Sequence, residues 1–179
     1  MKILEAGMQC PDFRETTIDG RNIDLGANPR QKFWLMFYRY ASCPLCNFHL
    51  ATVMQEYAQL KKRGVDVVAI FESEESKFPP KMKQGILSTL PMISNPEKNL
   101  YDLYRVGKSL GGVLHPKVLG SLVKAVAAGH PQGVPDGQLT QLTAHFLINP
   151  GGIIHTAHYG KTIDDNISWG RVKQFAAHS

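Results

Sequence analysis

FWLMFYRYASCPLC, residues 33–46, joins a short apolar run to a pair of closely spaced cysteines. Residues 33–38 are continuously apolar and aromatic, which predicts a strand buried on both faces. Pro44 suits the first residue of a helix, because the N–H that it lacks would be unpaired there. We therefore expect a strand that ends near Arg39 and a helix that begins with the C-x-x-C motif Cys43–Cys46.

The sequence after this motif continues as a helix followed by a second buried strand. Apolar residues recur at helical spacing from Leu45 onward, and the cations of residues 61–63 suit the negative end of the helix dipole. Gly64 is a natural helix stop, and Val65–Phe71 is an apolar run of strand length. Residues 33–71 therefore predict two parallel strands joined through a helix by a right-handed crossover.

The rest of the chain predicts shorter elements around this unit. We expect, in chain order, a hairpin over Thr16–Leu25 with Asp19-Gly20 as a two-residue turn, a charged helix over Ser73–Lys83, a strand over Pro91–Ser94, a helix capped by Asn95, an antiparallel hairpin of Leu142–Asn149 with Ile153–Tyr159, and a closing helix over Asp164–Ala177. Residues 107–140, rich in glycine and proline, are interpreted as an irregular insertion or lid with one helix near Val118–Ala127. A chain of this length fits one domain, so we expect residues 1–179 to form a single α/β domain.

Composition and charge narrow the class of protein. Hydrophobic residues make up 43% of the chain, as in a globular protein with a core, and the formal net charge is +5. The lysines and arginines are neither clustered nor interleaved with aromatic residues, which argues against nucleic acid as a partner. Residues 1–7 lack the apolar stretch of a signal peptide, and every apolar run is too short to cross a bilayer. We therefore expect a cytoplasmic protein that binds no membrane.

Three cysteines are present, and two of them form the C-x-x-C motif. An odd count in a chain that we expect to be cytoplasmic argues against structural disulfides. A sulfur at a helix N-terminus faces unpaired N–H groups and the positive end of the dipole, which lower the pKa of a thiol from about 8.5. We expect Cys43 to lie at the exposed tip as the attacking thiolate and Cys46, one turn further in, to be the buried resolving thiol. Burial of both sulfurs among packed side chains would contradict this expectation.

Other interpretations of these residues stay open at this point. The motif could supply half of a zinc site, with His49 as a third ligand, or it could be two inert core thiols. Arg39 either lowers the pKa of the Cys43 thiol as a nearby cation or caps a loop at the surface. Cys10 is either a small buried hydrophobe or a distal resolving thiol. The histidines scattered over residues 115–158 are expected to have no role in the chemistry.

Several segments together resemble one known family. Residues 37–47 resemble the F-Y-R and C-P-x-C pattern of the peroxiredoxin-like branch of the alkyl hydroperoxide reductase/thiol-specific antioxidant family, within the thioredoxin-like superfamily. Gly7–Phe13 is similar to the G-x-x-A-P-D-F segment with which domains of that family begin. Asn95–Tyr101 is similar to the family's D-P-x-x-x-L-Y segment, and His145–Gly152 is similar to its T-F-V-I-D-x-x-G hairpin. The resemblance implies a thioredoxin-like α/β fold, with a central mixed sheet, helices on both faces and an N-terminal hairpin.

The sequence also departs from that family. Peroxiredoxins carry the motif P-x-x-x-T-x-x-C. If Cys43 is aligned with the cysteine of that motif, Met36 and Tyr40 occupy its proline and threonine positions. If Cys46 is aligned instead, Arg39 and Cys43 occupy them. The downstream arginine that helps to polarise a peroxide is absent from residues 106–170, and Ala144 stands where thioredoxins place a cis-proline. Peroxide reduction depends on groups that stabilise charge on the breaking O–O bond. Thiol–disulfide exchange needs only the activated pair of thiols, so we expect it to be the better-supported reaction.

The resemblance, with these departures, implies a thiol oxidoreductase in which Cys43, Cys46 and Arg39 carry the reaction. It implies a dithiol that reduces disulfides and that reacts at most slowly with hydrogen peroxide. It implies neither a cofactor nor a metal. A thiol reductant such as thioredoxin or glutathione would restore the dithiol. The alternatives are a non-enzymatic thioredoxin-fold module that binds a partner through residues 107–140, and a redox sensor whose disulfide state changes the conformation of that insertion.

Overall fold

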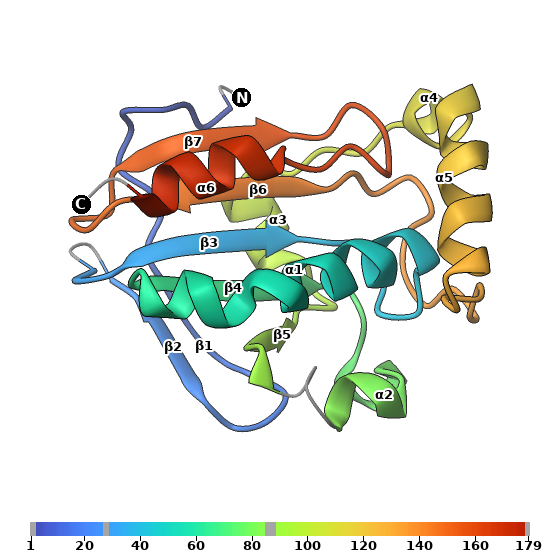
Figure 1. The fold of residues 1–179 in the computed structure, drawn as a ribbon, viewed down its shortest axis with the longest axis horizontal. Coiled ribbons are helices and arrows are strands. Elements are labelled where there is room, and N and C mark those ends of the chain that lie inside the picture. The colour runs from blue at the N-terminus through green and yellow to red at the C-terminus, as the bar shows by residue number, and fades with distance from the viewer. Residues whose placement is uncertain (1–2, 27–28, 85–88, 178–179) are drawn as a thin grey trace.

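A five-stranded mixed sheet forms the centre of the protein, in the strand order β5-β4-β3-β6-β7 (Figure 1). The computed structural model describes residues 3–26, 29–84 and 89–177. β3 pairs parallel with β4 and antiparallel with β6, so the sheet is mixed as expected. Its strands are β3 (Lys32–Phe37), β4 (Val65–Phe71), β5 (Met92–Ser94), β6 (Ala144–Ile148) and β7 (Ile154–Tyr159).

The strand, helix and second strand that start at residue 33 fold as the sequence predicts. Helix α1 (Pro44–Lys62) connects β3 to the parallel strand β4 and begins at the C-x-x-C motif. Gly64 follows the helix with a φ of +70°, a left-handed conformation that favours glycine over other residues. The apolar runs predicted these strands because both of their faces are buried.

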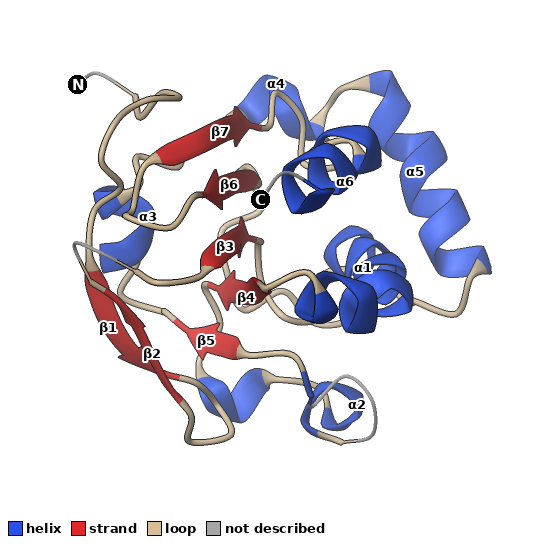
Figure 2. Ribbon diagram, turned by 60° about the vertical axis from the view of Figure 1, so that its left-hand side comes forward, coloured by secondary structure: helices blue, strands red, loops and turns tan. Residues whose placement is uncertain are grey.

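Helices cover both faces of the sheet, which confirms the predicted fold class (Figure 2). On one face, the side chains of Trp34 and Met36 pack with α1 and with α6 (Trp169–Ala177). On the other face, Leu35 and Phe37 pack with α3 (Asn99–Leu103) and with residues of the N-terminal hairpin. The alternation of side chains along β3 therefore divides the protein into two cores.

The N-terminal hairpin is present, but its turn differs from the prediction. β1 (Phe13–Thr16) pairs antiparallel with β2 (Asn22–Leu25), and Thr17–Arg21 connects them in place of a two-residue turn at Asp19-Gly20. The Thr17 hydroxyl accepts a hydrogen bond from the Arg21 N–H at 2.9 Å. Side-chain bonds of this kind stabilise a longer turn that the dipeptide alone does not indicate.

Three predicted helices are shorter than expected. In place of one helix over Ser73–Lys83, the chain forms a 3-10 turn, η1 (Glu75–Lys77), and a separate short helix, α2 (Pro80–Lys83), because two consecutive prolines cannot continue a helix. Helix α3 begins at Asn99, and the side chain of Asn95 accepts from the Leu100 N–H at 3.1 Å across an intervening turn. Helix α6 begins at Trp169, five residues later than predicted.

Residues 107–140 contain more regular structure than an irregular insertion. They form α4 (Leu110–Val113) and α5 (Pro116–Ala127), which lie beyond the end of the sheet at which α1 begins (Figure 1). The chain then returns towards β6 through residues 130–139, here called the strap, which contains no regular secondary structure. Among the described residues, no helix is long and apolar enough to cross a membrane.

Candidate functional site

The C-x-x-C motif lies where the end of β3 turns into α1. Cys43 is the N-cap of α1 in an extended conformation, and its N–H donates to the Tyr40 carbonyl at 3.0 Å. The side-chain amide of Asn47 donates to the carbonyls of Ala41 and Cys43 at 2.7 and 2.8 Å. These bonds hold the turn rigidly, so the sulfur of Cys43 is fixed at the helix N-terminus that the sequence predicts.

The two thiols of the motif have opposite electrostatic environments. Burial opposes a charge on Cys43, but the Cys46 thiol, the Arg39 cation and the N–H groups of Cys46 and Leu45 outweigh it and lower the pKa of Cys43 to about 7. Burial raises the pKa of Cys46 well above its usual value, and the neighbouring Cys43 sulfur raises it further. Of the two thiols, Cys43 is therefore the one that this environment favours as the thiolate, with Cys46 as the protonated hydrogen-bond donor beside it.

Arg39 is a buried cation beside the first thiol. It is only 4% exposed, so Arg39 is not an arginine that caps a loop at the surface. Its Nη1 lies 3.6 Å from the Cys43 Sγ, and its Nη2 donates to the Leu139 carbonyl at 2.6 Å. The guanidinium also lies over the Tyr40 ring, 5.0 Å from the ring centre. The structure thus brings Arg39, Cys43 and Cys46 together, as the sequence predicts for the site.

The prediction of an exposed Cys43 is wrong. The residue is 0% exposed, and Cys46 is buried as well. The strap lies over the motif: the Ser42 hydroxyl donates to the Val134 carbonyl at 2.7 Å, and the Gln132 amide donates to the Tyr40 hydroxyl at 3.0 Å. The segment that lies over the motif therefore comes from the insertion.

Ionisation and access are therefore separate properties of this site. The lowered pKa of Cys43 agrees with the expected attacking thiol, and its role in a reaction stays a prediction. The expected exposure fails, since Cys43 is fully buried and the strap is hydrogen-bonded to the neighbouring residues Tyr40 and Ser42. The strap is joined to the motif by a few side-chain and backbone hydrogen bonds and has no helix or strand of its own, which is typical of segments that open locally.

A glycine in the strap provides a test of this cover. A Cβ added at Gly133 would lie 2.5 Å from the Cβ of Ser42, so Gly133→Ala must displace the strap. Overpacking of this kind costs about 1–3 kcal/mol, so we expect alkylation of Cys43 by iodoacetamide to become roughly 10-fold faster. Gly120→Ala is the matched control, because a Cβ there meets open space in α5. Equal alkylation rates in both variants and the parent would mean that the strap does not limit access.

A buried ion pair beneath the strap was not anticipated from the sequence. The side chain of Glu72 is fully buried and pairs with Lys98 at 2.6 Å. Burial raises the pKa of Glu72, against the opposing effect of Lys98. The Glu72 N–H donates to the Arg39 carbonyl, and a Cβ at Gly137 of the strap would meet the Glu72 carboxylate. The signal was a glutamate directly after a buried strand, between the predicted strand Val65–Phe71 and the predicted helix Ser73–Lys83, and it was assigned to neither.

The remaining candidates lie elsewhere. His49, which the sequence left open as a zinc ligand, shares a 2.6 Å hydrogen bond with the Tyr38 hydroxyl instead. Cys10 belongs to the core on the opposite face of the sheet, where burial raises the pKa of its thiol, so it cannot act as a distal resolving thiol without rearrangement. His145 is fully buried next to His49, with ring centres 5.4 Å apart.

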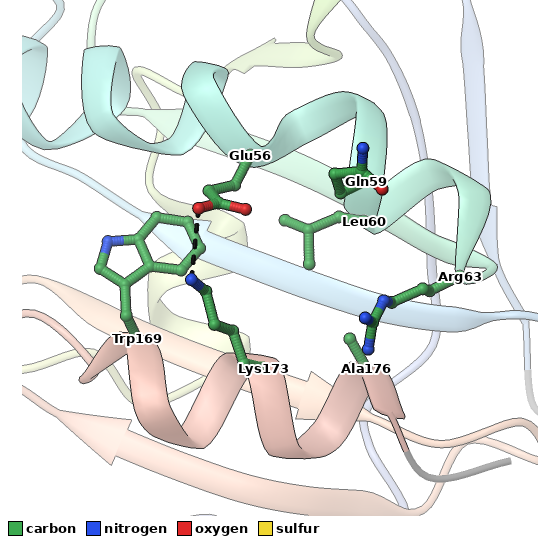
Figure 3. Close-up of a pocket in the computed structure, with 7 residues that line it drawn as sticks. All are labelled: Glu56, Gln59, Leu60, Arg63, Trp169, Lys173 and Ala176. Atoms are coloured by element: carbon green, nitrogen blue, oxygen red, sulfur yellow. Dashed lines mark ion pairs between the residues drawn. The ribbon is translucent and has the colours of Figure 1, made fainter.

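A pocket at the other end of α1 is separate from the cysteines (Figure 3). It lies between the C-terminal half of α1 and helix α6, and the Glu56–Lys173 ion pair of 3.3 Å crosses it. Neither cysteine of the motif lines it, so it is not the redox site.

Comparison with solved structures supports the fold. A peroxiredoxin-like protein of Aquifex aeolicus aligns with a TM-score of 0.67 at 14% identity, over 98% of this chain and 88% of that one. The peroxidoxin BcpB of Mycobacterium tuberculosis aligns with a TM-score of 0.65 at 13% identity, over 97% and 95%. The reduced 2-Cys peroxiredoxin of Plasmodium vivax aligns with a TM-score of 0.64 at 15% identity, over 97% and 80%.

Comparison of the sequence gives the family. Curated protein sequences yield no match to the chain. The family profile described as AhpC/TSA matches residues 6–157, a span that holds the whole sheet except the end of β7 and includes both cysteines of the motif. The fold and this match agree with the resemblance noted from the sequence, and the chain belongs to the AhpC/TSA family.

Proposed function

We propose that this protein is a thiol oxidoreductase, formed by one domain over residues 1–179, in which Cys43 attacks the substrate and Cys46 resolves the product. The observation that carries the proposal is the position of the Cys43 sulfur at the start of α1, 3.6 Å from the buried Arg39 cation. That arrangement stabilises a thiolate at neutral pH and leaves a protonated thiol next to it.

The reaction with a disulfide proceeds in two exchanges. The Cys43 thiolate forms a bond to one sulfur of the substrate, the S–S bond of the substrate breaks, and the second sulfur leaves as a thiolate that takes up a proton. Cys46 then loses its proton and attacks Cys43, which releases the first sulfur as a thiol and forms a Cys43–Cys46 disulfide. A thiol reductant, for which thioredoxin and glutathione are the candidates, returns two electrons to the pair.

The same thiolate can attack a peroxide, with formation of an S–O bond and release of the second oxygen as a protonated leaving group. Arg39 is a donor beside the sulfur that can stabilise charge on the breaking O–O bond. The family's threonine and downstream arginine are missing, so the site has fewer such donors. We therefore propose disulfide reduction as the main activity and a slower reaction with hydrogen peroxide.

The pH dependence of Cys43 alkylation tests the proposal. We expect the iodoacetamide rate to rise with a midpoint near pH 7, since the thiolate is the reactive form. Arg39→Met keeps the apolar stem but removes the charge, and it should raise the midpoint by about one pH unit or more. Arg39→Lys keeps a cation and should shift the midpoint less. A midpoint of about 8.5 or higher in the parent protein, the value of an unperturbed thiol, would contradict the proposal.

A further inference from the structure

Helix α5 exposes large apolar side chains on the side that faces away from the core. Leu119, Val123 and Val126 are 68%, 61% and 46% exposed, and their spacing of four and three residues places them on one face of the helix. The stripe of these three residues is here called the outer face of α5. Val118 and Ala125 on the opposite side of the helix are buried in the core. Helix α5 therefore buries one apolar face and exposes a second one.

The exposed apolar surface continues from α5 onto α4. Leu110 begins α4 and is 74% exposed, and Leu114 directly after α4 is 82% exposed. Leu114 and Leu119 line one concavity, so the exposed side chains of the two helices adjoin. Scattered exposed leucines need no explanation, but a contiguous apolar surface of this kind marks a site of interaction.

Positive charge borders this surface. Lys117 and Lys124 are exposed and lie two helical turns apart, on the flank of α5 between its outer face and its buried face. Residues 103–135 contain no Asp or Glu. The carboxylate of Asp164 accepts from the Ser121 hydroxyl at 2.5 Å, on the side of the helix opposite the outer face. The outer face of α5 is therefore apolar with a cationic edge, and its own segment supplies no acidic side chain.

The outer face of α5 lies at one end of the molecule. In both views α5 lies beyond the end of the sheet, and no other labelled element lies outside it (Figures 1 and 2). A helical peptide partner is held in a groove. Side chains that project from the end of a molecule instead suit a flat and extended partner, such as the surface of a bilayer.

The charges argue against a second copy of the chain as this partner. Two copies that packed through the outer face of α5 would bring Lys117 and Lys124 of both copies together, and residues 103–135 hold no carboxylate to neutralise them. Like charges across an interface are unfavourable, whereas an anionic partner would be attracted. The observations thus favour a partner that is apolar inside and negatively charged at its surface.

We infer that the outer face of α5 docks the protein on an anionic lipid bilayer, with α5 lying in the plane of the membrane surface. Leu119, Val123 and Val126 enter the boundary between headgroups and acyl chains, and Lys117 and Lys124 reach the lipid phosphates beside them. The inference does not depend on the proposed function. The absence of a membrane partner was expected because every apolar run is too short to cross a bilayer, but a helix that lies on a bilayer needs only one apolar face.

Flotation of the protein with lipid vesicles tests the inference. One set of vesicles contains phosphatidylcholine alone, and the other contains phosphatidylglycerol as about one lipid in three. Leu119→Gln/Val123→Gln makes the outer face of α5 polar without a change of charge. Lys117→Gln/Lys124→Gln removes the two cations beside it. Glutamine is a good helix former, so both variants keep α5.

Two control variants make the same kinds of change elsewhere. Ile3→Gln/Leu103→Gln alters two aliphatic residues that are 49% and 40% exposed and lie outside α4 and α5. Lys62→Gln/Arg171→Gln removes two exposed cations from α1 and α6. Far-UV circular dichroism of all four variants checks that they fold like the parent protein.

We expect the parent protein to bind the vesicles with phosphatidylglycerol at least ~10-fold more tightly than those without it. A lysine near an anionic membrane surface improves binding roughly 5-fold, so the lysine variant should lose at least ~10-fold in affinity for these vesicles. The apolar variant should lose at least ~10-fold as well. Both controls should stay within ~3-fold of the parent. Raising the ionic strength from ~0.1 M to ~0.5 M should weaken binding of the parent by screening the lysines.

The inference fails if the parent protein does not bind the vesicles with phosphatidylglycerol, or if the controls lose as much binding as the two α5 variants. Sedimentation velocity tests the second copy: a parent dimer that Leu119→Gln/Val123→Gln makes monomeric, together with no binding to vesicles, would overturn the inference. An acidic amphipathic peptide of leucine and glutamate tests a protein partner. Binding of this peptide without any binding to vesicles would also overturn it.

Discussion

Serine in place of Cys43 is expected to lower the rate of disulfide and peroxide reduction at least ~1,000-fold. A serine hydroxyl stays protonated at neutral pH and cannot form the mixed disulfide, so the Arg39 cation and the helix N-terminus would have no anion to stabilise. Steady-state turnover with 4,4′-dithiodipyridine and a thiol reductant provides the measurement. A binding module that uses the same surface would keep its partner in the Cys43→Ser variant, which separates that alternative from an enzyme.

The resolving thiol should behave differently from the attacking thiol. Cys46→Ser leaves Cys43 able to attack once, so we expect a stable adduct on Cys43 that mass spectrometry detects and a turnover rate limited by an external thiol. Cys10→Ala is the control, because Cys10 lies in the core on the other face of the sheet, and its turnover should stay within about 2-fold of the parent. Full turnover in Cys43→Ser, or loss in all three variants alike, would refute the assignment of roles.

The part of the site that the sequence predicts is the part built from local interactions. The apolar run of β3, Pro44 at the start of α1 and the spacing of Cys43 and Cys46 all lie within a few residues of one another. A strand that feeds directly into a helix fixes where the motif lies, whatever the rest of the chain does. Arg39 comes close to Cys43 for the same reason, because the two residues are only four positions apart in the sequence.

The cover over the site could not be predicted, because it depends on contacts between distant parts of the chain. Ser42 and Val134 are 92 residues apart, and Arg39 and Leu139 are 100 residues apart. Glycine and proline in the strap indicate an irregular path, but they do not indicate which surface that path crosses. The sequence therefore predicts the place of Cys43 at the start of α1 correctly and its exposure wrongly.

The histidines illustrate the same limit in the core. His49 is on α1, His145 is on β6 and His158 is on β7, so the sequence presents them as unrelated residues. Pairing of β6 with β7 places His145 opposite His158, and α1 packs His49 against His145. Three imidazoles thus lie in one row beneath α1, with His145 between His49 and His158, and the absence of a chemical role for the histidines of residues 115–158 stays a prediction.

This cluster predicts that the protein loses stability in mild acid. Burial lowers the pKa of His49 to about 4, and burial together with the neighbouring His49 lowers the pKa of His145 well below its usual value. The unfolded chain, with histidine pKa values of about 6.5, binds protons that the folded protein does not, so stability falls as the pH drops below about 6.5. For His49 alone, we expect the free energy of unfolding to be about 2 kcal/mol lower at pH 5 than at pH 7.5.

Urea unfolding at pH 7.5, 6 and 5 measures this slope above the range in which most carboxylates titrate. His49→Gln can still accept from the Tyr38 hydroxyl and His145→Gln can still pair with Asn166, but neither can titrate, so each should flatten the dependence on pH even where it lowers stability at pH 7.5. His155→Gln is the control, because His155 is exposed on β7 and its loss should leave the slope unchanged. Between pH 7.5 and 5, acid protonates His49 and His145 mainly in the unfolded chain. If the free energy of unfolding changed equally with pH in the parent and in all three variants, these two histidines would not control the stability in acid.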